Sequence, residues 1–235
     1  MFGRKKRNST DAAEKAAEEN GAPQGEEAGE PDQDVTDPRA NGPWDEAEFS
    51  GERGDYLDMG ALLVKPISGV TVRMEVDQRT KVPRAVNLDF RDGSVQLQAF
   101  TAPKTAQLWD EVRAELVAGL RRDGGNPTVS QGPLGLQVDA KFPGTTPDGQ
   151  KGYRLARFVG IDGPRWFLRA VISGPAAVDR EKAGLMYALI KATVVHRDDV
   201  PREPRSLLPL ELPSDSPENG SMAARSQPRP GTAPA

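Results

Sequence analysis

The chain has 235 residues, a formal net charge of −4 and no cysteine. Without cysteine it cannot form disulfides, Cys-ligated zinc sites or iron–sulfur clusters, and thiol catalysis is excluded. A reducing cytoplasm is therefore the expected compartment, and no apolar run is long enough to span a membrane. Residues 1–54 hold 7 Lys and Arg against 14 Asp and Glu, so they carry −7 and the rest of the chain carries +3.

The first 41 residues are predicted to form a disordered tail, basic at its start and acidic afterwards. They are rich in Glu, Asp, Ala, Gly and Pro, which bury too little apolar surface to offset the ordering entropy of the chain. An arm over residues 42–57 follows, in which Trp44 and Phe49 stand among acidic residues. Two interpretations stay open for these rings: the arm docks on its own domain, or it presents a motif to a partner protein.

A single domain is expected over residues 58–213, and its first half is rich in strands. Short or alternating apolar runs predict four of them, at residues 60–66, 70–76, 82–90 and 94–101. A helix is predicted from Pro103 to Arg122, with Thr101 as its N-cap and Gly124-Gly125 as its end. Trp109 falls on the apolar stripe of this helix and is expected in the core.

The second half repeats the order of four strands and a helix. Strands are predicted at residues 128–131, 136–142, 153–161 and 165–173, and the helix at residues 176–193. Asp162-Gly163 predicts a two-residue hairpin turn, because both residues tolerate the positive φ that such turns need. Beyond this turn, alternate residues of the last strand are expected to face the core: Trp166, Leu168, Ala170 and Ile172.

Residues 196–213 combine several prolines with several leucines. The prolines rule out a regular helix or central strand, and the leucines are too apolar to be left in water. The segment is therefore expected to lie along the domain as an extended strap. A disordered tail is predicted over residues 214–235.

This order of elements favours the α+β class, with an antiparallel sheet of about seven or eight strands and both helices packed on one face. The layout is similar to the fold shared by the Mog1 and PsbP proteins. That similarity is an analogy of arrangement alone and implies no function.

No constellation of catalytic residues stands out in the sequence. His196 is the one histidine, and the chain has no phosphate-binding glycine loop, dinucleotide fingerprint or nucleophile elbow, so no metal or cofactor is expected. The sharpest candidate site is a group of arginines near the hairpin that could clamp a carboxylate or phosphate: Arg154, Arg157, Arg165 and Arg169. The alternative is that these arginines pair with acids of the domain such as Asp139 or Asp162.

Six blocks of sequence stand in a recognisable order. They are GPWD at 42–45, LDMGALLVKP at 57–66, AFTAPKTAQLWDEVRAEL at 99–116, GPLG at 132–135, VGIDGPRWFLRAVISGPAA at 159–177 and VVHRDDVPREPRSLLPLELP at 194–213. Together they resemble the actinobacterial family called domain of unknown function 3710, over about residues 42–213. The resemblance implies no activity, no cofactor and no catalytic residue.

Three functions remain open at this point. The first is a non-enzymatic cytoplasmic module that binds a partner protein, with these candidate contact residues: Arg157, Arg165, Phe167, Arg169, Trp44 and Phe49. The second is a domain that binds a small anionic ligand or a nucleotide through the arginine cluster. The third is an accessory protein associated with nucleic acid, which the mildly basic charge of residues 55–235 disfavours.

Overall fold

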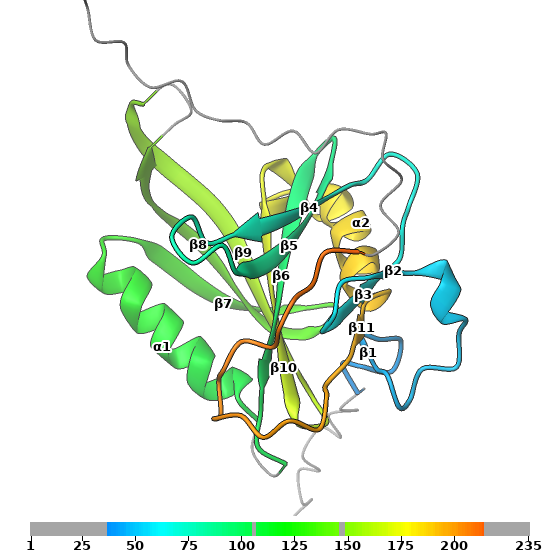
Figure 1. The fold of residues 1–235 in the computed structure, drawn as a ribbon. Coiled ribbons are helices and arrows are strands. Elements are labelled where there is room, and N and C mark those ends of the chain that lie inside the picture. Colours follow the sequence, from blue (N-terminus) through cyan, green and yellow to red (C-terminus); the bar gives the residue numbers. More distant parts are fainter. Residues whose placement is uncertain (1–36, 105–106, 146–148, 214–235) are drawn as a thin grey trace, which may run out of the picture. The chain divides into compact units, whose positions relative to one another are not determined.

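The computed structural model describes residues 37–104, 107–145 and 149–213 (Figure 1). The tails expected over residues 1–41 and 214–235 lie outside this part of the chain, apart from residues 37–41. Two sheets and two α-helices make up an α+β fold, as the sequence predicted. Within the described ranges, no helix is both long and apolar enough to cross a membrane.

Seven antiparallel strands form the large sheet, in the order β4-β5-β6-β10-β9-β8-β7. Their bounds are β4 Thr71–Val76, β5 Pro83–Phe90, β6 Gly93–Thr101, β7 Asn126–Gly132, β8 Gly135–Thr145, β9 Lys151–Gly163 and β10 Trp166–Ser173. The alternation along β10 is the one that the sequence predicted, because Trp166, Leu168, Ala170 and Ile172 are all fully buried.

A second sheet consists of four short strands in the order β1-β11-β3-β2. Their bounds are β1 Trp44–Asp45, β2 Leu57–Asp58, β3 Leu62–Val64 and β11 Val194–Val195. A 3-10 turn, Arg53–Asp55, lies between β1 and β2. β1 pairs in parallel with β11, so the arm lies against the last strand of the domain.

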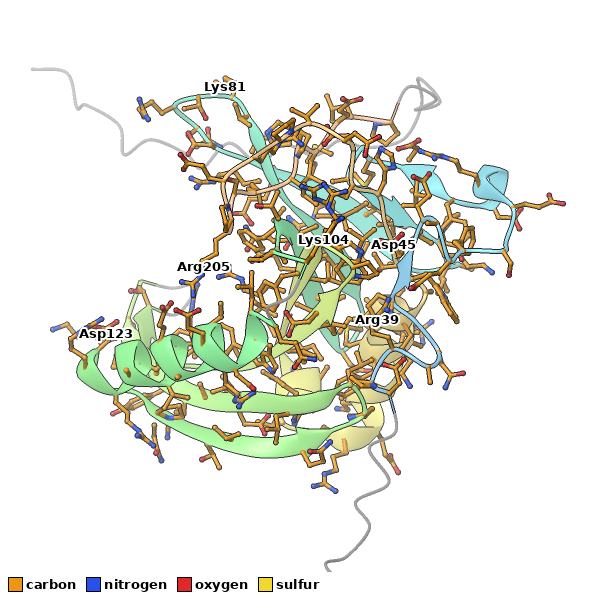
Figure 2. The ribbon with its side chains drawn as sticks, turned by 90° about the horizontal axis from the view of Figure 1, so that it is seen from below. Arg39, Asp45, Lys81, Lys104, Asp123 and Arg205 are labelled. Atoms are coloured by element: carbon orange, nitrogen blue, oxygen red, sulfur yellow. The ribbon has the colours of Figure 1, made fainter. Side chains whose placement is uncertain are left out.

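The helices α1 (Trp109–Arg122) and α2 (Arg180–Lys191) lie on opposite faces of the large sheet (Figures 1 and 2). α2 packs through residues such as Met186 against the face that carries Trp166, together with β3 and β11. α1 covers the other face over β7, β8 and β9. The expectation of both helices on one face is therefore corrected. Both faces of β9 and β10 carry apolar side chains, so each face needs its own cover.

Both helices begin later than the sequence predicted. α1 starts at Trp109, and Thr101, the expected N-cap, is the last residue of β6. α2 starts after a 3-10 turn, Pro175–Ala177, and its N-cap is Asp179. The Asp179 carboxylate accepts the N–H groups of Glu181 and Lys182 at 2.9 and 3.4 Å, which fixes the first turn of the helix.

The strap, residues 196–213, runs beside the ends of both sheets. The N–H of Leu208 donates to the carbonyl of Ala99 in β6 over 2.8 Å, and that of Glu211 donates to the carbonyl of Met59 over 3.0 Å. Leu208 and Leu210 are buried. Arg205 reaches α1, where it forms ion pairs of 2.6 and 3.1 Å with Glu111 and Glu115 (Figure 2).

Candidate functional site

The hairpin between β9 and β10 carries most of the candidate residues, and its turn lies two residues later than expected. Gly163 pairs with Trp166, so the turn consists of Pro164 and Arg165. Arg165 has a φ of 62°, the left-handed conformation that the third position of such a turn requires. Its carbonyl accepts the N–H of Ala102 over 2.9 Å. The structure thus gives Arg165 a role in the turn.

Asp162, expected in that turn, caps α1 instead. Its carboxylate accepts the N–H of Leu108 over 2.7 Å and the N–H of Trp109 over 3.1 Å. These are N–H groups that the start of a helix leaves without partners. Burial raises the pKa of Asp162 and outweighs the two hydrogen bonds, which act in the other direction. No local sequence pattern predicts this contact, because Asp162 lies 53 residues after Trp109, the first residue of the helix.

Arg157 is buried and belongs to a network of polar side chains below α2. Its Nε donates to Asp139 over 2.6 Å, and its other end lies 3.5 Å from the hydroxyl of Tyr187. Tyr187 in turn donates to Gln137, and Ser130 donates to Asp139 over 2.6 Å. The structure therefore favours, for Arg157, the alternative of pairing with Asp139. With 7% of its surface exposed, Arg157 links the sheet to α2 through Asp139 and Tyr187.

Phe167 is a core residue rather than the surface contact that its position suggested. Only 3% of its surface is exposed. Its ring stacks on Trp109 of α1, with the ring centres 6.1 Å apart, and lies 6.2 Å from the ring of Phe100. Around Phe167 this face of the sheet is covered by α1.

Arg169 differs from its neighbours, because it is half-buried and has no acidic partner in the part of the chain that the structure describes. Its Nη2 donates to the side chain of Gln98, and its guanidinium lies 5.9 Å from the ring centre of Phe100. Its Nε is buried and has no hydrogen-bond partner within the described residues. Burial lowers the pKa of Arg169, since a charged group loses solvation there.

The predicted arginine cluster does not form. Arg157 lies opposite Ile172 and Arg169 lies opposite Gly160, so the two guanidinium groups project from opposite faces of the sheet. Arg154 is exposed in the outer part of β9. Arg169 remains, surrounded by half-buried side chains of β6, β9 and β10 that we call the Arg169 face: Gln96, Gln98, Phe100, Phe158, Arg169 and Val171.

The arm contacts the domain through both its backbone and its side chains. The N–H of Trp44 donates to the carbonyl of Thr193 over 3.0 Å, and Asp45 accepts the indole N–H of Trp166 over 2.7 Å. Phe49 packs edge-on against Tyr56. Both candidate aromatic residues of the arm are half-buried, so part of each ring stays accessible.

Two cavities lie elsewhere, and each is lined by an ion pair. One of about 210 Å³ lies beside His196, where Arg53 binds Asp58 over 2.9 Å. The other, of about 370 Å³, lies at the start of α1, where Arg113 binds Asp110 over 2.7 Å. In the part of the chain that the structure describes, no three His, Cys, Asp or Glu residues gather as a metal site would need.

Comparison with curated proteins finds no match. Among solved structures, a protein from Bacteroides thetaiotaomicron is similar over 63% of this chain and 50% of its own, with 14% identity and a TM-score of 0.38. This chain thus spans about half the length of that protein, and the likeness is too weak to transfer a function. A family model described as "Protein of unknown function (DUF3710)" matches residues 42–219, well over half of the chain. The match includes the arm, both sheets, both helices and the strap, so the chain belongs to the DUF3710 family.

Proposed function

We propose that this domain is a non-enzymatic interaction module that binds a partner protein through the Arg169 face. The observation that carries this proposal is the half-buried guanidinium of Arg169, whose Nε has no partner within the described residues. A cation in such a place loses solvation without gaining an ion pair, which is unfavourable for folding alone. A carboxylate from a partner would neutralise the guanidinium as a whole and so offset this lost solvation, although the Nε itself is buried.

The surroundings of Arg169 suit a protein contact. Phe100 and Phe158 offer partly exposed aromatic surface, and Gln96 and Gln98 offer amide groups. Arginine and aromatic residues are enriched at the centres of protein interfaces, where they contribute most of the binding energy. A guanidinium also binds a carboxylate through two parallel hydrogen bonds, which gives orientation as well as affinity.

A second candidate is a small anionic ligand, such as a phosphorylated metabolite or a nucleotide, bound by the same guanidinium. Small ligands favour concave sites that enclose most of their surface. Neither of the two cavities described above is lined by Arg169. We therefore favour the partner protein over the small ligand. The lack of cysteine favours a reducing compartment such as the cytoplasm for either function.

The test is affinity capture by the tagged full chain, with quantitative identification of bound proteins. We compare wild type, Arg169→Gln and Arg169→Lys, which keeps the charge but loses the planar fork. Arg180→Gln is the control, because Arg180 is exposed at the start of α2 on the opposite face of the sheet. Point variants are preferred to deletion of residues 1–54, since the arm supplies the acceptor for Trp166.

A partner bound at this face is expected to bind Arg169→Gln about tenfold less tightly or worse, a change of at least about 1.4 kcal/mol. Arg180→Gln should retain it. Thermal unfolding of the full chain with a panel of nucleotides and phosphorylated metabolites separates the two candidates. A shift that Arg169→Gln abolishes would favour the small ligand, whereas identical captured proteins from all variants would refute the proposed face.

A further inference from the structure

The strands β8 and β9 continue beyond the large sheet as a two-stranded ribbon, in which residues 141–145 pair with residues 151–155. β10 ends opposite Ala156, and β7 begins opposite Lys141. Figure 1 shows β8 and β9 reaching past their neighbours. Within the described ranges, both outer edges of the ribbon therefore lack a third strand.

The two edges of the ribbon differ in what they can bind. The β8 edge contains Pro143, which has no N–H to donate, and its backbone is approached by the end of α1. A Cβ on Gly125 would lie 3.2 Å from the carbonyl oxygen of Lys141. The β9 edge, residues 151–155, has no proline, so each of its residues carries both an N–H and a carbonyl. Only the β9 edge is suited to pair with an added strand.

The side chains along this edge are unusually exposed for their type. Tyr153 is 65% exposed and Leu155 is 43% exposed, and they share one face of the strand because they are two residues apart. The ammonium group of Lys141 lies 4.5 Å from the ring centre of Tyr153. An added strand would place alternate apolar side chains beside Tyr153 and Leu155, which gives specificity beyond backbone hydrogen bonds.

The charged side chains of the ribbon that the structure describes, in residues 141–145 and 149–155, are all positive. Five cations gather on the ribbon and at the end of α1, and none of them forms an ion pair with a described residue: Lys141, Lys151, Arg154, Arg121 and Arg122. The end of α1 lies at the base of the ribbon, since a Cβ on Gly125 would come within 3.1 Å of the Cβ of Phe142. Asp123 lies at the same end of α1 (Figure 2), and Asp139, next along β8, is paired with Arg157.

We infer that the open β9 edge, residues 151–155, binds an extended acidic segment of a partner protein by strand addition. The N–H and carbonyl groups of alternate residues that point away from β8 favour an extended polypeptide, and the cations of the ribbon, Lys141, Lys151 and Arg154, favour acidic residues in it. This inference goes beyond the proposed function, because the β9 edge is a different surface from the Arg169 face. The proposed function and this inference can each be refuted without the other, because each is tested with its own variants.

The experiment selects peptides from a random displayed library on the immobilised full chain. The expected consensus alternates acidic with apolar residues. Selected peptides are resynthesised and measured against wild type, Tyr153→Ser and Arg154→Glu, both exposed positions where a change leaves the core intact. Arg79→Glu is the control, with the same change of charge on the exposed turn between β4 and β5.

Binding should weaken by about tenfold or more in Arg154→Glu, which exchanges attraction for repulsion, and stay unchanged in Arg79→Glu. A peptide resynthesised with a central proline should also lose binding, because proline cannot complete the added strand. Bound peptide should slow hydrogen exchange at the amides of residues 151–155. A peptide that binds through charge attraction alone would bind equally well with the central proline.

Three outcomes would overturn the inference. No enrichment from the library would show that the cations merely protect an open edge against aggregation. Selected peptides that bind Arg154→Glu and Tyr153→Ser as well as wild type would place the binding site elsewhere. Displacement of the peptides by single-stranded oligonucleotides, with affinity that falls steeply with salt, would assign the ribbon to nucleic acid.

Discussion

Trp166 donates its indole N–H to the carboxylate of Asp45 over 2.7 Å, a bond between residues 121 positions apart in the chain. Trp166 is the first residue of β10 and is completely buried, whereas Asp45 is the last residue of β1 in the arm. The arm is therefore fastened to the hairpin by a side-chain contact as well as by the pairing of β1 with β11. A buried donor left without an acceptor destabilises a protein by about 1–3 kcal/mol.

The first prediction concerns this bond. Asp45→Ala should lower the free energy of unfolding by about 1–3 kcal/mol, because the indole N–H stays buried and unpaired. Asp55→Ala is the control, since Asp55 is exposed and its side chain forms no ion pair with a described residue, and its effect should stay within about 0.5 kcal/mol. Urea denaturation followed by tryptophan fluorescence measures both. Equal stability of Asp45→Ala and wild type would mean that water replaces the carboxylate.

The strands were predictable from sequence because a strand's pattern is local. Which residues of β10 are buried follows from alternation alone, and the structure buries all four that alternation selects. Contacts between distant segments have no such local signal. Asp162 was interpreted as a turn residue because Asp-Gly is a strong turn signal, yet its carboxylate receives two N–H groups from the start of α1. For the same reason, the sequence did not predict that the two helices lie on opposite faces of the large sheet.

The predicted arginine cluster does not form, and the pairing of β9 with β10 explains why. Arg157 and Arg169 are close along neighbouring strands, but pairing places Arg157 opposite Ile172, on the face of the core. A shift of the turn by two residues leaves the face of each residue unchanged, because strands alternate with a period of two. Applying this alternation to both strands would have separated the two arginines. It would not have found Asp139, which pairs with Arg157 from β8.

A second prediction tests the packing of α1 on the sheet. Gly160 leaves space for the indole of Trp109, and a Cβ at that position would lie 2.2 Å from two of the ring carbons. Gly160→Ala should therefore lower the free energy of unfolding by about 1–3 kcal/mol, because the indole and the helix have to shift. The measurement is thermal or urea denaturation of the purified full chain.

Gly184→Ala is the matched control for Gly160→Ala. A Cβ at Gly184 in α2 meets nothing within 4 Å, and alanine is favoured over glycine inside a helix by about 1 kcal/mol. The same substitution should thus raise stability at Gly184 and lower it at Gly160. A neutral Gly160→Ala would contradict the contact between Trp109 and β9.

The third prediction is a dependence of stability on pH through Asp139. Burial raises the pKa of this carboxyl, but hydrogen bonds from Ser130, Arg157 and Gln137 and the charge of Arg157 outweigh it, so the net pKa is lowered. A lowered pKa in the folded state means that the ionised carboxylate stabilises the fold. This stability is fully present above the unfolded pKa of about 3.9 and is lost as the pH falls through the lower folded value.

The comparison of wild type with Asp139→Asn isolates this contribution. The difference in unfolding free energy should be largest near about pH 7 and should shrink as the pH falls below about 4, because protonation removes the charge that asparagine lacks at every pH. Denaturation at a series of pH values measures it. A difference that is constant over that range would show that Asp139 does not titrate with folding.

The last prediction compares the two arginines that the sequence grouped together. Arg157→Met should lower the free energy of unfolding by about 3–5 kcal/mol, because it leaves the partly buried carboxylate of Asp139 without its cation. Arg169→Met should be neutral or slightly stabilising, because among the described residues Arg169 has no acidic partner and its Nε has no hydrogen bond. Denaturation of the full chain gives both values under one condition, and circular dichroism confirms that both variants fold.

A residue that can be removed without loss of stability, although burial disfavours its charge, is more readily explained by binding than by folding. The contrast between the variants therefore bears directly on the Arg169 face. If Arg169→Met lowered stability as much as Arg157→Met, Arg169 would be a structural residue and the proposed function would lose the observation that carries it. If Arg169→Met is as stable as wild type but no longer captures the partner, Arg169 is needed for binding and not for folding.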